Sequence, residues 1–261
     1  MLRSLHSAAT GMEAQQTYID ITSNNLANVN TAGFKKSRAN FTDLIYQLQQ
    51  APGVATTQAT EAPAGIQVGI GVRTASTQKE FAIGSLKATN NLLDVAINGD
   101  GFFQIQMPNG TIGYTRDGAF HVDKNGNLVT PAGFPLEPNI VVPNEAIAVH
   151  IGDDGSVSAM LTAQAEAVQL GQIQTATFVN PAGLVNIGGN IAQETSASGP
   201  AVVGIAGENG FGPLQAGFLE LSNVEVVEEM VNLITAQRAF EFNSKAVQAS
   251  DQMLRELAQL R

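Results

Sequence analysis

The last forty residues constrain this chain most, because they predict one long helix. Residues 222–260 contain neither Gly nor Pro. Ser222 and Glu225 have the spacing of a capping box, in which each side chain bonds a free backbone N–H at the helix start. An apolar column then repeats every seven residues: Val226, Leu233, Phe240, Val247 and Leu254. Such a repeat is typical of a helix that packs along its length against other helices.

A second apolar column with the same spacing lies at the other end of the chain: Leu5, Met12, Ile19 and Leu26. The polar residues between them are mostly uncharged, whereas solvated helix faces usually carry Lys and Glu. We therefore expect the two terminal helices to pair as a coiled coil and to contact protein on several sides. The alternative is a C-terminal helix that lies across its own domain. The polar companions Gln237, Ser244 and Asp251 disfavour that alternative.

A stretch rich in Asn follows the first helix and should end it near Asn28. Gly33 is available for a positive φ. The basic residues Lys35, Lys36 and Arg38 come next, and we expect them to be solvated rather than to form a binding patch.

Residues 44–78 carry only two charges and are filled with Gln, Ala, Thr, Pro and Gly, which is typical of an extended linker. Within this stretch, residues 66–72 alternate as a strand does. Such an uncharged stretch could become ordered by lying against neighbouring subunits.

From residue 84 onward the apolar pattern has period two, and turn dipeptides separate the apolar runs. Asn109-Gly110, Asn125-Gly126 and Asp154-Gly155 favour the positive φ of tight turns. This pattern indicates an antiparallel β domain. Residues 163–169 could form either a helical turn or an excursion from that domain.

The predicted fold is therefore mixed, with long terminal α-helices, an extended segment and a central, mostly antiparallel β domain. We expect an N-terminal helix over residues 1–30 and an extended segment over 31–79. The β domain should cover residues 80–220 and the C-terminal helix 221–261.

Composition excludes several classes of function. The 261 residues contain no Cys and no Trp and carry a formal charge of −10, which argues against disulfides and against nucleic acid or anionic membranes as partners. No apolar run reaches the length of a membrane span, and the N-terminus lacks a cleavable secretory signal. The three His residues lie on separate segments without zinc-ligand spacing. Nothing in the sequence indicates a catalytic residue, a metal or a cofactor.

Three ordered motifs resemble those of the flagellar rod and hook proteins. The first comprises residues 8–12 and 24–35 (AATGM and NNLANVNTAGFK). The second comprises residues 84–87, 93–103 and 114–120 (GSLK, LDVAINGDGFF and YTRDGAF). The third comprises residues 222–225 and 236–240 (SNVE and AQRAF), and continues to Met253-Leu254. Within that family, the Gln- and Pro-rich insert over 48–72 is similar to the segment that distinguishes distal rod members. This insert includes Gln49, Pro52, Pro63 and Gly65.

The resemblance implies a helical tube of many copies that spans the periplasm as part of the flagellar basal body. The terminal helices would line the inner tube, and the β domain would form its outer wall. Implied partners are further copies of the chain, proximal rod proteins, the hook protein, the P- and L-ring proteins, the rod cap and the type III export apparatus. Neither nucleic acid nor membrane insertion is implied.

Other readings stay open from the residues alone. The chain could be a proximal rod or hook paralogue. It could also be a monomeric periplasmic binding protein, or an enzyme that acts on the cell wall through carboxylates brought together in space.

Overall fold

The computed structural model describes residues 2–51, 55–57, 60–61, 64–161 and 167–259. The chain divides into two compact units. Residues 1–27, 37–78 and 225–261 form the helical unit, and residues 28–36 and 79–224 form the β unit. The backbone therefore passes between the units four times. Among the described residues, no helix is long and apolar enough to cross a membrane.

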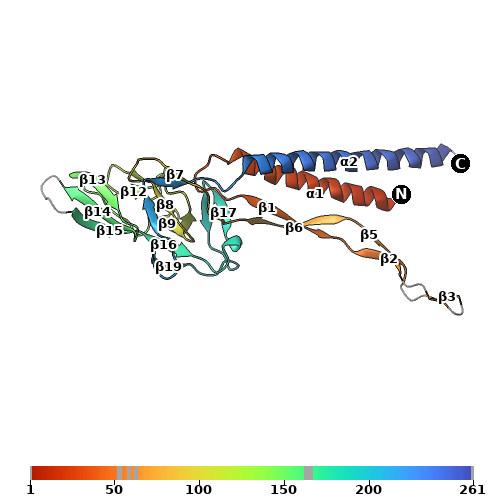
Figure 1. Cartoon of the computed structure of the whole chain (residues 1–261), viewed down its shortest axis with the longest axis horizontal. Helices are drawn as coiled ribbons and strands as arrows, with labels where there is room; N and C mark the ends of the chain where they lie inside the picture. Colours follow the sequence, from red (N-terminus) through yellow and green to blue (C-terminus); the bar gives the residue numbers. More distant parts are fainter. Residues whose placement is uncertain (1, 52–54, 58–59, 62–63, 162–166, 260–261) are drawn as a thin grey trace. The chain divides into compact units, whose positions relative to one another are not determined.

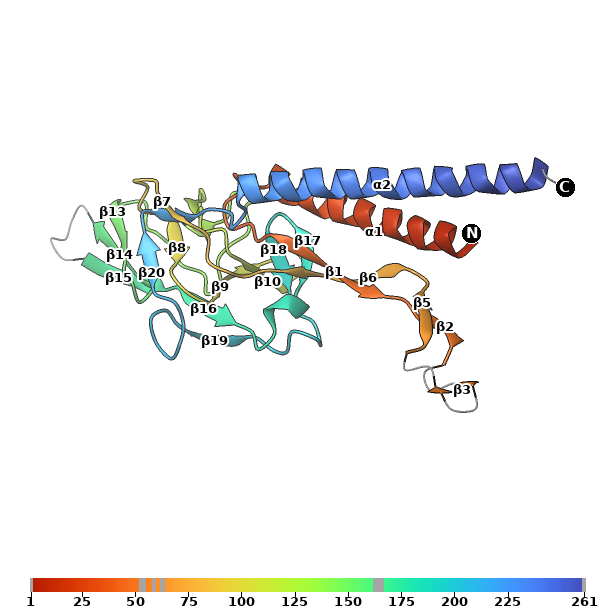
Figure 2. The same cartoon turned by 45° about the vertical axis from the view of Figure 1, so that its right-hand side comes forward.

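Two long helices form most of the helical unit, as the heptad columns predict. They are α1 (Leu2–Ala27) and α2 (Val226–Gln259), and they lie side by side in both views (Figures 1 and 2). The predicted capping box is wrong, because α2 begins later than Ser222. The Ser222 hydroxyl accepts from the backbone N–H of Val224, and the first helical bond runs from the Glu229 N–H to the Glu225 carbonyl. Glu228 and Glu229 still lie in the first turn, where negative charge suits the helix dipole.

The other described residues of the helical unit mostly form a two-stranded ribbon rather than an unstructured linker. Its strands pair as β1 (Ser37–Asp43) with β6 (Val72–Lys79), β2 (Tyr46–Gln50) with β5 (Ile66–Gly69), and β3 (Ala55–Thr57) with β4 (Thr60–Glu61). The register of β2 with β5 is antiparallel, Tyr46 facing Gly69. The predicted strand over residues 66–72 thus corresponds to β5 and the start of β6. Extended polar segments form strands here because each pairs its backbone with the other arm of the ribbon.

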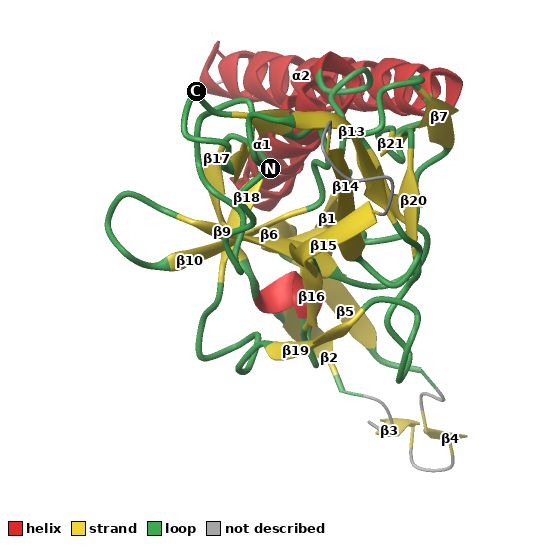
Figure 3. Cartoon of the chain, turned by 90° about the vertical axis from the view of Figure 1, so that its left-hand side faces the viewer, coloured by secondary structure: helices red, strands yellow, loops and turns green. Residues whose placement is uncertain are grey.

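The β unit contains a six-stranded antiparallel sheet, and Figure 3 shows its strands in yellow with the connecting loops in green. In spatial order its strands are β17 (Val185–Gly188), β18 (Ile191–Gln193), β10 (Ile112–Thr115), β9 (Phe102–Gln106), β16 (Gln174–Thr177) and β19 (Val202–Ile205). A three-stranded sheet contains β13 (Ala146–Ile151), β14 (Ser156–Leu161) and β15 (Ala167–Gln172). The antiparallel β domain predicted from period-two patterning is confirmed.

Short ladders and one 3-10 turn complete the β unit. The ladders pair β7 (Leu86–Ala88) with β21 (Phe218–Glu220), β8 (Val95–Ile97) with β20 (Leu214–Ala216), and β11 (His121–Val122) with β12 (Leu128–Val129). The 3-10 turn is η1 (Pro181–Gly183). The possible helical turn at 163–169 is not seen in its described part, because residues 167–169 belong to β15; residues 162–166 lie outside the described residues.

The predicted turn glycines have positive φ at Gly110, Gly126 and Gly155. The main core of the unit lies among the strands they connect. Its fully buried members include Phe103, Phe120, Ile105, Leu128, Leu136 and Leu214. A smaller aromatic cluster around Phe102, Tyr114 and Phe178 has edge-to-face ring contacts. These two clusters support the polar groups described next.

Candidate assembly site

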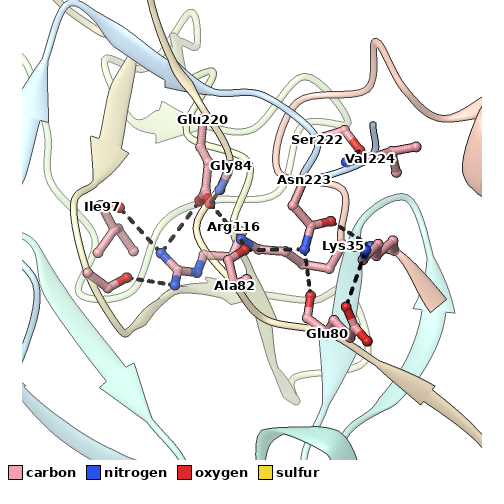
Figure 4. A network of polar contacts seen from close by, with 12 residues as sticks. Lys35, Glu80, Ala82, Gly84, Ile97, Arg116, Glu220, Ser222, Asn223 and Val224 are labelled. Carbon is pink, nitrogen blue, oxygen red and sulfur yellow. Dashed lines mark hydrogen bonds and ion pairs between the residues drawn. The ribbon is translucent and has the colours of Figure 1, made fainter. Parts of the chain in front are cut away.

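The β unit contains a buried ion cluster made of one carboxylate and two cations. Glu220, the last residue of β21, accepts a 2.5 Å hydrogen bond from Lys35 Nζ and lies 3.5 Å from Arg116 Nη1 (Figure 4). All three side chains are at least 97% buried. Lys35 Nζ also donates to the Ala82 carbonyl at 2.7 Å, and Arg116 Nη2 donates to the Gly99 carbonyl at 2.7 Å. The cluster thus connects segments that lie far apart in the sequence.

Burial governs the electrostatics of this cluster. It lowers the pKa of Lys35, and the neighbouring Glu220 carboxylate opposes that shift. Burial likewise lowers the pKa of Arg116, again against Glu220 and also Asp100. A buried charge that loses its partner keeps its desolvation penalty, which amounts to about 3–5 kcal/mol. The three side chains therefore stabilise the fold only as a set.

The expectation that Lys35 is solvated is wrong. A short basic run is usually a solvated surface, and the partner of Lys35 lies 185 positions later in the sequence. Lys36 is half-buried and pairs with Glu80 at 3.5 Å, whereas Arg38 is exposed. Only the first of the three basic residues enters the interior.

Backbone and amide groups tie together three of the chain segments that lead into or out of the β unit. The Asn223 side chain accepts from the Lys36 N–H at 2.8 Å and donates to the Glu80 carbonyl at 2.9 Å (Figure 4). The Glu80 N–H donates to the Lys36 carbonyl at 2.9 Å. Together with the ion cluster, this network fixes the segments that follow α1, follow β6 and precede α2.

Gly33 shows why the first motif requires glycine at this position. Its φ is +67°, and a Cβ there would lie 2.6 Å from the backbone carbon of Arg116. Its N–H donates to the backbone carbonyl of Glu220 at 2.8 Å. The predicted positive φ is confirmed, and glycine lets the backbone approach the cluster closely.

Small and polar residues form a seam between α1 and α2. Ser4 Oγ lies 3.4 Å from Ser250 Oγ, and Asn25 Nδ2 donates to Glu229 Oε2 at 3.4 Å. A Cβ on Gly11 would meet the Asn243 amide at 2.9 Å. These pairs are separated by multiples of seven residues along both helices, in opposite order, so the helices run antiparallel.

The predicted apolar columns lie beside this seam rather than in its centre. Half-buried members are Leu5, Met12, Ile19, Leu26, Leu233, Phe240, Val247 and Leu254, and Val226 is exposed. Sequence reasoning followed the large apolar side chains and missed the seam. Its signal was the heptad series of small and polar residues, Ser4 with Gly11 and Asn243 with Ser250, which allow close approach of two helices.

The insert residues predicted as rod-specific lie on the ribbon of the helical unit. Gln49 is exposed in β2, and Gly65 immediately precedes β5. Pro52 and Pro63 lie outside the described residues. Large apolar side chains on the ribbon are exposed, including Ile45, Tyr46, Leu48 and Ile66.

Several large apolar side chains of α2 are also exposed. They are Val226, Val227, Met230, Val231, Ile234, Phe242 and Met253. By contrast, the part of the chain that the structure describes holds no cluster of His, Cys, Asp or Glu suited to a metal ion.

Comparison with known proteins agrees with the three motifs. Residues 5–35 match the family described as "Flagella basal body rod protein". Residues 96–159 match "Flagellar hook protein FlgE/F/G D1 domain", and residues 215–260 match "Flagellar basal body rod FlgEFG protein C-terminal". Each matched region overlaps one of the three motifs identified in the sequence.

Individual relatives separate rod from hook proteins. The chain is 51% identical to the flagellar basal-body rod protein FlgG of Borreliella burgdorferi, over 97% of each chain. It is 49% identical to FlgG of Buchnera aphidicola from Schizaphis graminum, over the full length of both. The flagellar hook protein FlgE of Helicobacter mustelae is 48% identical, but over only 52% of this chain and 30% of its own. The resemblance to rod and hook proteins is thus confirmed, and the chain belongs to the FlgG family of flagellar basal-body rod proteins.

Proposed function

We propose that this chain is the subunit of the distal rod, the part of the flagellar drive shaft that transmits motor torque to the hook. Many copies would assemble into one helical tube. The observation that carries the proposal is similarity to rod proteins over the whole length of both chains, whereas the hook relative matches only about half of this chain. Such a subunit is a structural protein and has no need of a catalytic site.

The exposed apolar side of α2 supplies a surface for neighbouring copies. Val227, Val231 and Ile234 follow the three- and four-residue spacing of one helix face, and all three are exposed. The half-buried columns that include Leu5, Met12, Leu233 and Phe240 would be covered further by the same contacts. In this proposal, a coiled coil forms among helices of several copies, beyond the α1–α2 pair of one chain.

The ribbon would stiffen the tube. A two-stranded ribbon alone is marginally stable in water, and this one exposes Tyr46, Leu48 and Ile66. Contact with neighbouring copies would bury those side chains and fix the ribbon. The insert over 48–72, with Gln49, Pro52, Pro63 and Gly65, would then separate a rigid rod from a bendable hook.

The remaining partners follow from a place in the rod. Proximal rod proteins would contact one end of the tube and the hook protein the other, while the P- and L-ring proteins would surround it in the periplasm. The type III export apparatus would deliver the chain, and a rod cap would guide its addition. The proposal includes neither nucleic acid nor membrane insertion.

Labelling of isolated basal bodies tests this placement. An antibody raised against the β unit should decorate the rod directly below the hook in electron micrographs. Labelling of the hook would instead indicate the hook paralogue. Recovery of all the protein as periplasmic monomer would favour a binding protein and contradict the proposal.

A further inference from the structure

A small hollow in the β unit lies beside the ion cluster, and the charged side chains that line it are all cations. It encloses about 20 Å³, which is room for one water-sized group. Lys35, Lys79 and Arg116 line it, and they are its only charged lining residues among those described. Phe34, Phe81 and Phe102 complete much of the wall. Apolar walls lower the local dielectric and strengthen the field of the three cations.

Within the part of the chain that the structure describes, Lys79 is a cation without a counter-charge. Its side chain is half-buried, and its Nζ lies 5.3 Å from the centre of the Phe34 ring. Among the described residues no carboxylate lies within ion-pair distance of this ammonium group. Burial lowers the pKa of Lys79, and no neighbouring charge opposes that shift.

Arg116 also has unused capacity. It is 4% exposed, and its Nε has no hydrogen-bond partner among the described residues. Arg116 also lines a larger cleft, of about 370 Å³, whose lining includes Asp100. The small hollow has no such carboxylate, and Glu220 is shared by Lys35 and Arg116. Buried cations are stable when paired, so the hollow is suited to an added negative charge.

We propose that the hollow receives one carboxylate oxygen from an Asp or Glu of a neighbouring copy of this chain. The inference rests on the proposed assembly into a tube. A single carboxylate oxygen fits the volume of the hollow, and its negative charge complements the cations that line it. Each copy has 23 Asp and Glu residues against 13 Lys and Arg, so its neighbours offer surplus carboxylates. A charged pair formed this way would be shielded from water by the surrounding aromatic rings.

A series of substitutions at residue 79 tests the inference in the full-length chain. The critical concentration for assembly is measured by sedimentation for Lys79→Arg, Lys79→Met and Lys79→Glu. The matched controls are Lys124→Arg, Lys124→Met and Lys124→Glu, at an exposed lysine in a turn of the same unit. Thermal unfolding of the unassembled protein reports whether each variant folds.

We expect Lys79→Arg to assemble nearly as the unsubstituted chain does. Lys79→Met should raise the critical concentration about tenfold, as for loss of one charged hydrogen bond, and Lys79→Glu should raise it further. The melting temperature of Lys79→Met should not fall, because the lost ammonium is desolvated without a counter-charge. The Lys124 series should leave assembly unchanged.

Two results would overturn the inference while leaving the proposed function intact. The first is a critical concentration of Lys79→Met equal to that of the unsubstituted chain, or a rise in the Lys124 series as large as in the Lys79 series. The other is binding of bromide, measured by bromide NMR relaxation, to the dilute unsubstituted monomer but not to the Lys79→Met variant. That result would assign the hollow to a free anion. Failure of the unsubstituted chain to assemble would contradict the proposed function itself, and this inference with it.

Discussion

At the scale of single residues, the ion cluster shows how a few polar side chains can fix distant segments. Glu220 is paired with Lys35 and Arg116 and also accepts from the Gly84 N–H at 2.9 Å. One carboxylate thus connects its own strand to three other stretches of the β unit. Because these partners are buried, loss of the carboxylate leaves two cations without their counter-charge and the Gly84 N–H without its acceptor.

Replacement of Glu220 should therefore destabilise the β unit strongly. Glu220→Gln removes the charge and keeps the shape, and we expect it to lower the free energy of unfolding by about 3–5 kcal/mol. Denaturant unfolding of the full chain measures the change. Glu208→Gln, at an exposed glutamate, is the control and should change stability by about 0.5 kcal/mol or less. Equal effects of the two substitutions would show that the cluster contributes no such stability.

Asp117 gives a pH-dependent prediction. Burial raises the pKa of its carboxyl group, with a smaller contribution from Asp94, against the Ala119 N–H and His121. The folded state thus disfavours the ionised form, so Asp117 destabilises the fold above its folded pKa. That effect disappears as the pH falls below the ordinary aspartate value of about 3.8.

The substitution Asp117→Asn keeps an oxygen that can accept from the Ala119 N–H, which lies 3.1 Å away. We expect the variant to be more stable than the unsubstituted chain at pH 7 and equally stable near pH 3. Urea unfolding at both values measures the difference. A gap that widens toward low pH would contradict the assigned direction of the pKa shift.

Local features at this scale could be predicted from the sequence, and distant ones could not. The positive φ of Gly33 follows from its place after an Asn-rich helix end. The burial of Lys35 could not be predicted, because its partner Glu220 is brought near only by the folded β unit. A lysine beside a second lysine carries no local sign of that environment.

At the scale of elements, the periodicity of the sequence predicts the helices α1 and α2 but not which of their faces form the seam between them. Heptad spacing predicts the two helices and approximately where they end. It does not settle which column faces the partner helix of the same chain. The small and polar column that includes Gly11 and Asn243 lies in the contact between α1 and α2, and the large apolar columns remain half-buried and can be covered further by other copies.

Gly11 should thus be sensitive to substitution within the helix pair. Gly11→Leu places a side chain where a Cβ alone would meet Asn243 at 2.9 Å, so the helices must separate. Leucine favours helices more than glycine by nearly 1 kcal/mol, so a loss of stability must come from packing. Hydrogen exchange over residues 2–27 should become faster. The control is Ala9→Leu, at an exposed position, which should leave exchange unchanged. If Gly11→Leu also leaves exchange unchanged, the helices do not pack tightly along this seam.

At the scale of the whole molecule, the extended segment is the part that sequence reasoning described least well. Low charge and many Gln, Ala and Thr residues are typical of a linker, yet most of the described residues between 37 and 79 pair as ribbon strands. The pairing depends on contacts between the two arms, such as Tyr46 with Gly69, and composition does not encode register. Its exposed Ile45 and Leu48 are consistent with burial only after assembly.

Deletion of residues 49–65 tests the stiffening role of this segment. Because the deletion leaves both helices and the β unit intact, export and polymerisation should continue. The assemblies should bend more, since the ribbon would no longer fill the space between copies. The curvature of filaments in electron micrographs measures the effect. Equally straight filaments would contradict the stiffening role, and complete loss of assembly would show that the segment is needed for subunit contact itself.

In the proposed function this chain forms a tube from many copies of itself. Electron microscopy of the concentrated, purified full-length protein is the test of that claim. We expect straight tubes with a helical repeat, because the exposed apolar side chains of α2 and of the ribbon require covering by other copies. Featureless monomers at every concentration, with both termini resistant to protease, would contradict the claim.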